Sequence, residues 1–401
     1  MLTPAPPRAA TVAHRQLDLT TAWEFSRGGG QRVAVIDTGV SRHPRLPDLV
    51  AGGDYVSGSD GTDDCDAHGT LVAGVIAARP DPKDEFSGVA PEAAIISIRQ
   101  VSLAFEAKDY NRRKDPGGLA VGGYGHVQTL ALAVLRAVEL GATVINISEV
   151  ACVPAGVEIT DGGLGAAVKY AYDRGVVVVA AAGNLLDSGP CATQNEGVGW
   201  NAVRTVASPA YFSPYVLSVA SVDPDGAPSS FSLYGPWVSV AAPGRDVTSL
   251  DSRPGATGLV NATPGENNAP IPVNGTSFAS AFVAGVAALV RARFPGLTAG
   301  QVMDRIIRTA HAPGPGRDDR IGAGMVDPVA ALTAQLPEHP VQAGAKDGKP
   351  ITAEAAPLWK DPWPERIAVI GSIACLAALG LGHAISIAYR RPERRREWTD
   401  E

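Results

Sequence analysis

The sequence has few cysteines: Cys65, Cys152, Cys191 and Cys375 are the only four among 401 residues. So few cysteines exclude a disulfide-based scaffold, and none lies in a Cys-x-x-Cys or Cys/His pattern of the zinc-binding kind. We therefore expect no metal site. Cys152 and Cys191 each follow a predicted strand, in loops that can be neighbours, and they are the candidates for a disulfide. Two small buried thiols are the alternative.

An excess of positive charge is also absent. The chain has 34 Lys and Arg residues against 41 Asp and Glu residues, a net charge of -7. A negative chain repels phosphate backbones, so we expect no nucleic-acid partner. With 45% hydrophobic residues, and with 45 Gly and 32 Pro that stay below the share of about 25 to 30% typical of low-complexity chains, the sequence predicts a globular protein with a large core.

The first 31 residues lack the apolar stretch of about 7 to 15 residues that a secretory signal contains. They are polar, include Pro4, Pro6 and Pro7, and end near three consecutive glycines, 28–30. We therefore assign residues 1–31 as an N-terminal extension.

From Arg32 onward, short Val- and Ile-rich runs alternate with helical patterns. Continuous apolar strands that alternate with helices indicate an α/β fold, a parallel sheet flanked by helices on both faces. The predicted strands are 33–36, 94–98, 143–147, 176–181, 216–220 and 237–241, and the predicted helices are 70–78, 129–140, 163–174 and 277–293. The sequence thus predicts one domain over residues 32–333.

One long hydrophobic run stands near the C-terminus, after a Pro-rich linker over residues 334–366. The run, 367–388, has no acidic or basic residue except His383, which makes it long enough to cross the roughly 30 Å of a bilayer core as a helix. Trp359, Trp363 and Tyr389 flank it as interface anchors, which argues against the alternative of a buried core helix. We therefore predict a C-terminal transmembrane helix over residues 367–389.

The basic tail, residues 390–401, contains five arginines, whereas only Lys360 and Arg366 lie just before the run. By the positive-inside rule the C-terminus is expected in the cytoplasm and residues 1–365 outside. Export of so large a domain requires a signal, so we expect the native gene product to carry one upstream of Met1.

Chemistry-bearing residues stand at the ends of the predicted elements. Asp37 follows the first strand, His68 begins an amphipathic helix, Asn184 follows the strand 176–181, and Ser277 begins an apolar helix. Each alone has an ordinary explanation: a turn or N-cap for Asp37 and Ser277, and a surface position for His68. Together they supply the carboxylate, imidazole, amide donor and hydroxyl of nucleophilic acyl transfer.

The order Asp37, His68, Asn184, Ser277, with the segments that flank each residue, resembles the subtilisin family of serine proteases over about residues 32–331. The resemblance implies that Asp37 orients His68, that His68 is the general acid and base, and that Ser277 is the nucleophile. Asn184 is then expected to form the oxyanion hole with the Ser277 N–H. No cofactor is expected for this chemistry.

The same resemblance implies a substrate cleft. Its edge segment is expected to be Gly123, Tyr124 and Gly125, and the walls of its specificity pocket are expected to be Ala181, Ala182 and Gly183 on one side and Ser148 and Glu149 on the other. Glu149 departs from the small, Gly-containing pattern typical of subtilisins, so we expect it to narrow the cleft or to favour particular side chains. Pairing of backbones in such a cleft gives affinity for protein or peptide substrates.

Within the family, the segments 53–56, 64–68 and 146–152 and the C-terminal apolar run resemble mycosins, the membrane-anchored subtilases of type VII secretion systems. This resemblance implies a serine endopeptidase of the cell membrane that cleaves exported proteins outside the cytoplasm and is a partner of the secretion membrane complex. The alternative is a structural subunit of that complex in which proteolysis is dispensable. Cys65 departs from the subfamily, because the insertion 99–120 contains no cysteine to pair with it.

An acidic cluster precedes His68: Asp60, Asp63, Asp64 and Asp66. It lacks the spacing and the closing Glu of an EF-hand calcium loop. We therefore expect a solvated loop beside the histidine.

Overall fold

The computed structural model covers the 401 residues and describes residues 3–4, 11–105, 125–157, 160–264, 267, 269–314, 316–336 and 380. The chain forms two compact units, residues 1–354 and 355–401, and Gly380 is the one described residue of the second. The predicted linker beyond residue 336, the membrane helix and the basic tail therefore lie, apart from Gly380, outside the described residues. Within the described part of the chain, no helix combines the length and apolarity needed to cross a bilayer.

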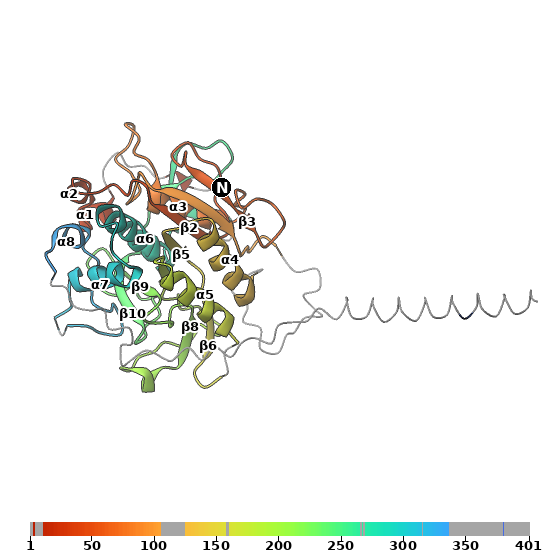
Figure 1. Ribbon diagram of the computed structural model, residues 1–401, viewed down its shortest axis with the longest axis vertical. Helices are drawn as coiled ribbons and strands as arrows, with labels where there is room; N and C mark the ends of the chain where they lie inside the picture. Colours follow the sequence, from red (N-terminus) through yellow and green to blue (C-terminus); the bar gives the residue numbers. More distant parts are fainter. Residues whose placement is uncertain are drawn as a thin grey trace, which may run out of the picture. The chain divides into compact units, whose positions relative to one another are not determined.

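A seven-stranded parallel sheet forms the centre of the first unit (Figure 1). Its order is β10-β9-β7-β5-β2-β4-β3. The strands are β2 (Arg32–Asp37), β3 (Leu49–Asp54), β4 (Ala94–Arg99), β5 (Val144–Ile147), β7 (Val177–Ala181), β9 (Leu217–Val222) and β10 (Val238–Pro243). β5, β7, β9 and β10 are buried along their whole length, as Val-rich strands covered on both faces must be.

Helices cover both faces of this sheet. α3 (His68–Ala77) and α6 (Thr276–Arg293) pack on the face that carries Val33 and Val35 of β2. α4 (Val127–Glu139) and α5 (Gly162–Asp173) pack on the opposite face, which carries Ala34 and Ile36. Because side chains alternate along a strand, β2 contributes to two separate cores. α6 is buried on all sides from Thr276 to Val290, which explains why its sequence is apolar all round.

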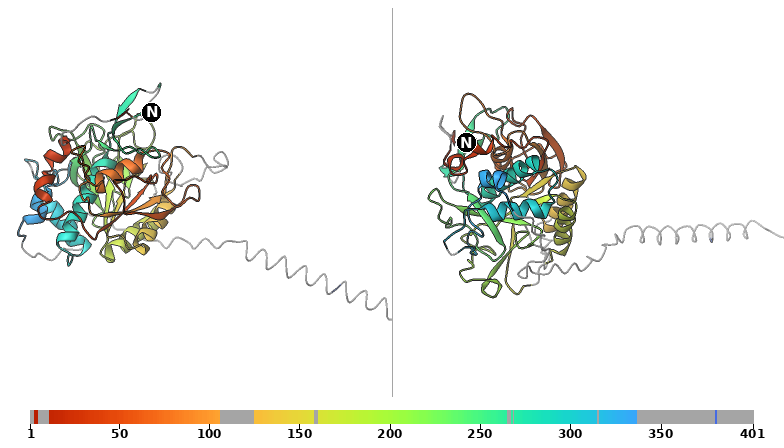
Figure 2. Two further views of the ribbon diagram at one scale, coloured as in Figure 1. Left: turned by 90° about the horizontal axis from the view of Figure 1, so that it is seen from above. Right: turned by 60° about the vertical axis from the view of Figure 1, so that its left-hand side comes forward.

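Part of the predicted N-terminal extension packs against this unit. It contains α1 (Val12–Gln16) and α2 (Leu19–Ala22), and α2 lies against α8 (Pro328–Thr333), as Figure 2 shows for the red and blue ends of the described chain. The Trp23 indole N–H donates to the carbonyl of Val89 at 2.8 Å, and Leu17 and Leu19 are buried. Residues 11–26 thus belong to the same core as α3 and α6.

The smaller elements lie around the sheet. They are α7 (Ala299–Thr309), the 3-10 helix η1 (Trp200–Ala202), the antiparallel pair β6 (Ala151–Pro154) and β8 (Thr205–Ser208), and a four-stranded sheet of β1 (Thr3–Pro4), β11 (Ser249–Leu250), β12 (Leu259–Pro264) and β13 (Pro270–Pro272). A disulfide joins Cys152 of β6 to Cys191, with the Cα atoms 5.3 Å apart. Cys65 is exposed and unpaired among the described cysteines.

Candidate active site

The chemistry-bearing residues meet at one edge of the sheet. β7, β5 and β2 are neighbours, and all three end at the edge where Asn184, Ser148 and Asp37 stand. The carboxyl ends of parallel strands are where α/β folds place their sites. α3 and α6 begin at this edge and add His68 and Ser277 at their N-termini.

A chain of short contacts links three of these side chains. His68 Nδ1 lies 2.7 Å from Asp37 Oδ1, and His68 Nε2 lies 2.9 Å from Ser277 Oγ. When Nδ1 carries the proton and donates it to Asp37, Nε2 is free to accept the hydroxyl proton of Ser277. The fold thereby arranges a carboxylate, an imidazole and a hydroxyl in a row, although Ser277 lies 209 positions after His68.

Asp37 is completely buried, yet it stays ionised. Burial opposes its charge, but the charge of His68 and hydrogen bonds from His68 and from the Thr38 backbone N–H outweigh this, so the pKa of Asp37 is held below its ordinary value. The buried carboxylate therefore stabilises a positive charge on the imidazole.

Several negatively charged carboxylates surround His68. Burial opposes its charge, but the carboxylate of Asp37, with smaller contributions from Glu149 and Asp64, raises the pKa of His68 to about 9. The ring also lies against Phe278, with centroids 5.2 Å apart. The charged imidazole that forms during proton transfer is thus stabilised before substrate arrives.

Asp64 fastens the end of β2 to the start of α3. Its Oδ1 accepts a hydrogen bond from the Thr38 hydroxyl at 2.8 Å, and its Oδ2 accepts from the Thr70 backbone N–H at 2.8 Å. The Thr38 hydroxyl oxygen in turn accepts from the Gly69 N–H at 2.9 Å. A Cβ on Gly69 would lie 2.0 Å from the carbonyl oxygen of Gly39, so only glycine allows this approach.

The acidic loop is only in part the solvated segment that the sequence predicts, because Asp60 and Asp63 are exposed, whereas Asp64 and Asp66 accept hydrogen bonds from other segments. Burial raises the pKa of Asp64 to about 6, despite its hydrogen bonds. Asp66 accepts hydrogen bonds from Ser102 and from the backbone N–H groups of Leu103 and Ala104, while Asp63 remains exposed. These hydrogen bonds cannot be seen in the sequence, because the partners Thr38 and Ser102 are 26 and 36 positions away from Asp64 and Asp66 and become neighbours only in the fold.

Asn184 is oriented by a residue that sequence reasoning did not single out. Its Oδ1 accepts hydrogen bonds from the backbone N–H and the hydroxyl of Thr276, both at 3.0 Å. The amide nitrogen, Nδ2, is thereby directed toward the start of α6. A Cβ built on Gly275 would lie 2.9 Å from Ser277 Oγ and 3.5 Å from Asn184 Nδ2, so the hydroxyl and the amide donor flank the same small space.

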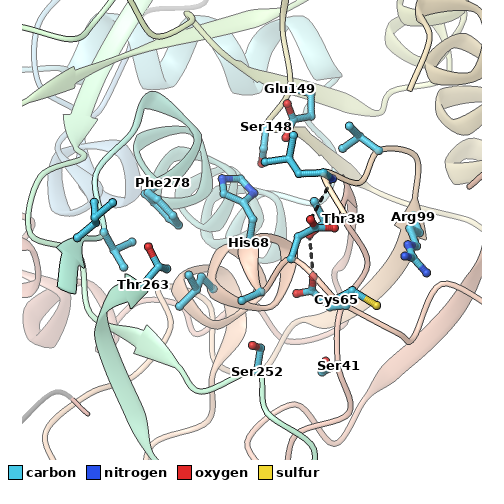
Figure 3. Close-up of a pocket in the computed structure, with 18 of the residues that line it drawn as sticks. Thr38, Ser41, Cys65, His68, Arg99, Ser148, Glu149, Ser252, Thr263 and Phe278 are labelled. Atoms are coloured by element: carbon cyan, nitrogen blue, oxygen red, sulfur yellow. Dashed lines mark hydrogen bonds between the residues drawn. The ribbon is translucent and has the colours of Figure 1, made fainter. Parts of the chain in front are cut away.

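A cleft of about 1580 Å³ opens above these groups (Figure 3). Of the predicted substrate-binding residues, Ser148, Glu149 and Gly183 line it. Gly125 lies beside the end of β4, against Gln100 and Val101, whereas Gly123 and Tyr124 fall outside the described residues. Ala181 and Ala182 are buried in the core behind Gly183 and do not line the cleft.

The two predicted walls of the specificity pocket approach each other closely. Val150 follows Glu149, and its Cγ2 would lie 3.3 Å from a Cβ added to Gly183, as would Cδ2 of Leu233. These branched side chains fill space between the ends of β5 and β7. Val150 and Leu233 therefore lie against the Gly183 wall of the predicted pocket.

Glu149 adds a second carboxylate to the site. A carboxylate oxygen of Glu149, a ring nitrogen of His68 and a carboxylate oxygen of Asp37 all lie within 4.8 Å of one another. Figure 3 shows Glu149 and Ser148 on the same side of the His68 ring. This is a possible donor set for a cation, but both ring nitrogens of His68 are already engaged, by Asp37 and by Ser277. The geometry therefore fits acid–base chemistry better than metal binding.

Comparison with known proteins places this geometry in context. The model of the subtilase family matches residues 28–324. Mycosin-4 of Mycobacterium tuberculosis is 49% identical over 386 residues, 94% of this chain and 82% of that protein. Mycosin-3 of the same organism is 44% identical over 96% of this chain and 86% of its own length.

Solved protein structures also superpose on this chain. The MycP3 protease from a type VII (ESX-3) secretion system superposes with a TM-score of 0.76 at 49% identity, covering 83% of this chain and 91% of that one. A chain of an intact ESX-5 inner membrane complex superposes with a TM-score of 0.77 at 42% identity, covering 96% of this chain and 92% of that one. A chain of the periplasmic assembly from the ESX-5 inner membrane complex also superposes with a TM-score of 0.77, at 44% identity, covering 89% of this chain and 90% of that one.

Proposed function

The chain belongs to the subtilase family of serine proteases and, within it, to the mycosins, and from this premise we propose that it is a membrane-anchored serine endopeptidase that cleaves exported proteins outside the cytoplasmic membrane, as a partner of a type VII secretion membrane complex. The observation that carries the proposal is the contact chain from Asp37 through His68 to Ser277, with Asn184 beside it. The carboxylate, imidazole and hydroxyl required for acyl transfer each lie at hydrogen-bond distance from the next.

In this mechanism the Ser277 hydroxyl attacks the scissile carbonyl while His68 Nε2 takes its proton. Asp37 keeps Nδ1 protonated and stabilises the imidazolium. The negative charge that develops on the carbonyl oxygen is stabilised by Asn184 Nδ2 and by the Ser277 backbone N–H, one of the unpaired donors at the start of α6. His68 then gives the proton to the leaving amine, and water, deprotonated by His68, releases the acyl group from Ser277.

The start of α6 supports this assignment of Ser277. The positive end of the helix dipole lies beside the nucleophile, where it favours developing negative charge. Ser277 is nearly buried, at 4% exposure, which limits the access of water to its backbone N–H. Proteolysis therefore takes place in a preorganised environment.

A fluorophosphonate probe tests this assignment directly. The probe forms a covalent bond with an activated serine, so it should label the protein in isolated membranes, and Ser277→Ala should abolish the label. Ser280→Ala is the matched control, because Ser280 is buried one helical turn away and its hydroxyl donates to the Ser277 carbonyl. Equal labelling of the wild type and of Ser277→Ala would contradict the proposal.

A structural role in the secretion complex is the second candidate. It is favoured by the similarity to a chain solved within an intact ESX-5 inner membrane complex. Complementation of a deletion strain with Ser277→Ala separates the two roles. Restored secretion with this variant would favour the structural role, whereas failure despite normal assembly would favour proteolysis.

A further inference from the structure

The Glu149 carboxylate has no hydrogen-bond or ion-pair partner among the residues that the structure describes. It is neither fully exposed nor fully buried, and it lines the cleft. A carboxylate that is partly removed from water without a partner is unfavourable, and a cation placed beside it is correspondingly favourable. The site therefore presents an unsatisfied negative charge to whatever occupies the cleft.

The arginines of the described cleft lining do not compensate this charge, because each is already paired with another acid. The pairs are Arg42 with Asp60 at 3.9 Å, Arg99 with Asp54 at 3.4 Å, and Arg253 with Asp251. His68 is the nearest cationic group, and it must be neutral to accept the Ser277 proton. During the reaction Glu149 therefore faces no permanent positive charge from the described part of the chain.

The position of Glu149 determines which residues of a bound substrate can contact its carboxylate. Its carboxylate lies within 4.8 Å of a ring nitrogen of His68, and His68 Nε2 lies 2.9 Å from Ser277 Oγ, the atom that meets the scissile carbonyl. An extended peptide advances about 3.3 to 3.6 Å per residue. Side chains that can reach Glu149 therefore belong to residues adjacent to the scissile bond or one position further.

We propose that Glu149 selects substrates that carry a cationic side chain, Lys or Arg, within two residues of the scissile bond. This rests on the proposed protease function. The cation forms a charge-assisted hydrogen bond with Glu149, and an acidic side chain at the same position is repelled by Glu149 and by the nearby carboxylates of Asp37 and Asp66.

The protonation of Glu149 supports this selectivity. Burial raises the pKa of Glu149 to about 7, with the charge of His68 opposing and the charge of Asp37 adding to the rise. A bound cation favours the ionised carboxylate and lowers this pKa. The preference for Lys is therefore expected to grow as the pH rises through 7.

The test uses fluorogenic peptides that differ at one position. Lys, its uncharged near-isostere norleucine, or Glu is placed in turn at each of the two residues before and the two residues after the scissile bond. At one position, kcat/KM for the Lys peptide should exceed that for the norleucine peptide about 10-fold, the size expected of one charge-assisted contact. Glu149→Gln should reduce the ratio to about 1, as the lost charge requires. Asp63→Asn, which removes the same charge from an exposed residue of the same cleft, should leave the ratio unchanged.

A Lys preference that survives in Glu149→Gln, or is lost equally in Asp63→Asn, would overturn the proposal. So would a Glu149→Gln variant that shifts the pH profile while the ratio stays as in the wild type, since Glu149 would then act on His68 alone. Binding of the same peptides to Ser277→Ala measures the ratio without catalysis. A protein that cleaves no peptide contradicts the proposed function, whereas equal dissociation constants for the Lys and norleucine peptides contradict the role of Glu149.

Discussion

Ser277 and His68 form one hydrogen-bonded unit, so their substitutions should not add. We predict that Ser277→Ala and His68→Ala each lower kcat by at least about 10⁴-fold and that the double variant is no slower than either single variant. The physical reason is that His68 without the Ser277 hydroxyl, or Ser277 without His68 as proton acceptor, does not accelerate the reaction by this mechanism. Kinetics of the three variants on one peptide substrate, with circular dichroism to verify folding, check this. A double variant much slower than both singles would contradict a shared mechanism.

Asn184 contributes one donor rather than the nucleophile, so its loss should be milder. Asn184→Ala should lower kcat by about 10² to 10³-fold with little change in KM, because the oxyanion forms only on the way to the transition state. Asn201→Ala, which alters an exposed asparagine of the 3-10 helix η1, serves as the control. A kcat that Asn184→Ala leaves unchanged would show that the donor is another group.

The acids around His68 determine the pH dependence. An unperturbed histidine has a pKa of about 6.5, whereas Asp37, Glu149 and Asp64 raise that of His68 to about 9. Only neutral His68 accepts the Ser277 proton, so kcat/KM should rise as the pH rises, with a midpoint above that of an unperturbed histidine. Glu149→Gln removes a negative charge that stabilises the imidazolium, and the midpoint should therefore move to lower pH. Profiles from pH 5 to about 10 measure both effects, and an unmoved or higher midpoint in the variant would contradict them.

At the scale of elements, the disulfide fixes the loop after β7 to β6. Cys152 and Cys191 are separated by 39 residues, and closing a loop of that length stabilises a fold by about 3 to 4 kcal/mol. The Cys152→Ala, Cys191→Ala double variant should melt on the order of 10 °C lower than the wild type. Thermal unfolding followed by circular dichroism measures this, and reduced wild type should resemble the variant. Cys65→Ser, at an exposed free thiol, should leave the midpoint unchanged; an equal midpoint for the double variant would contradict the prediction.

The elements differ in how far their sequences predict them. β5 and β7 are buried on both faces, so their Val and Ile runs identify them directly. β3 is not predicted, because it lies at the edge of the sheet, has largely half-exposed residues and contains Gly52 and Gly53. A Cβ on Gly52 would lie 2.5 Å from the carbonyl oxygen of Ser97 on the neighbouring strand, so this glycine is required by pairing that no local pattern shows.

At the scale of the whole molecule, the proposed topology is testable. We predict that protease added to intact spheroplasts digests residues 1–333 and spares a tag placed after Glu401, because the arginines at 390–396 favour a cytoplasmic tail. Replacing these five arginines by glutamine is expected to weaken this orientation, whereas replacing Glu393 and Glu397 by glutamine should matter little. A cleaved tag with a protected catalytic domain would contradict membrane anchoring with an external protease.

The sequence by itself determined the family, the strands of the central sheet other than β3, and the identity of the candidate triad. Asp37, His68 and Ser277 stand in motifs whose flanking strands and helices are continuous in the chain, so local patterns suffice to find them. Only the tertiary structure decided how Asp64 bonds to Thr38 and Thr70, how Thr276 directs the Asn184 amide and how the Glu149 carboxylate approaches His68. These features depend on side-chain distances between segments as many as 92 residues apart, and on the loss of water around them, which a linear pattern does not encode.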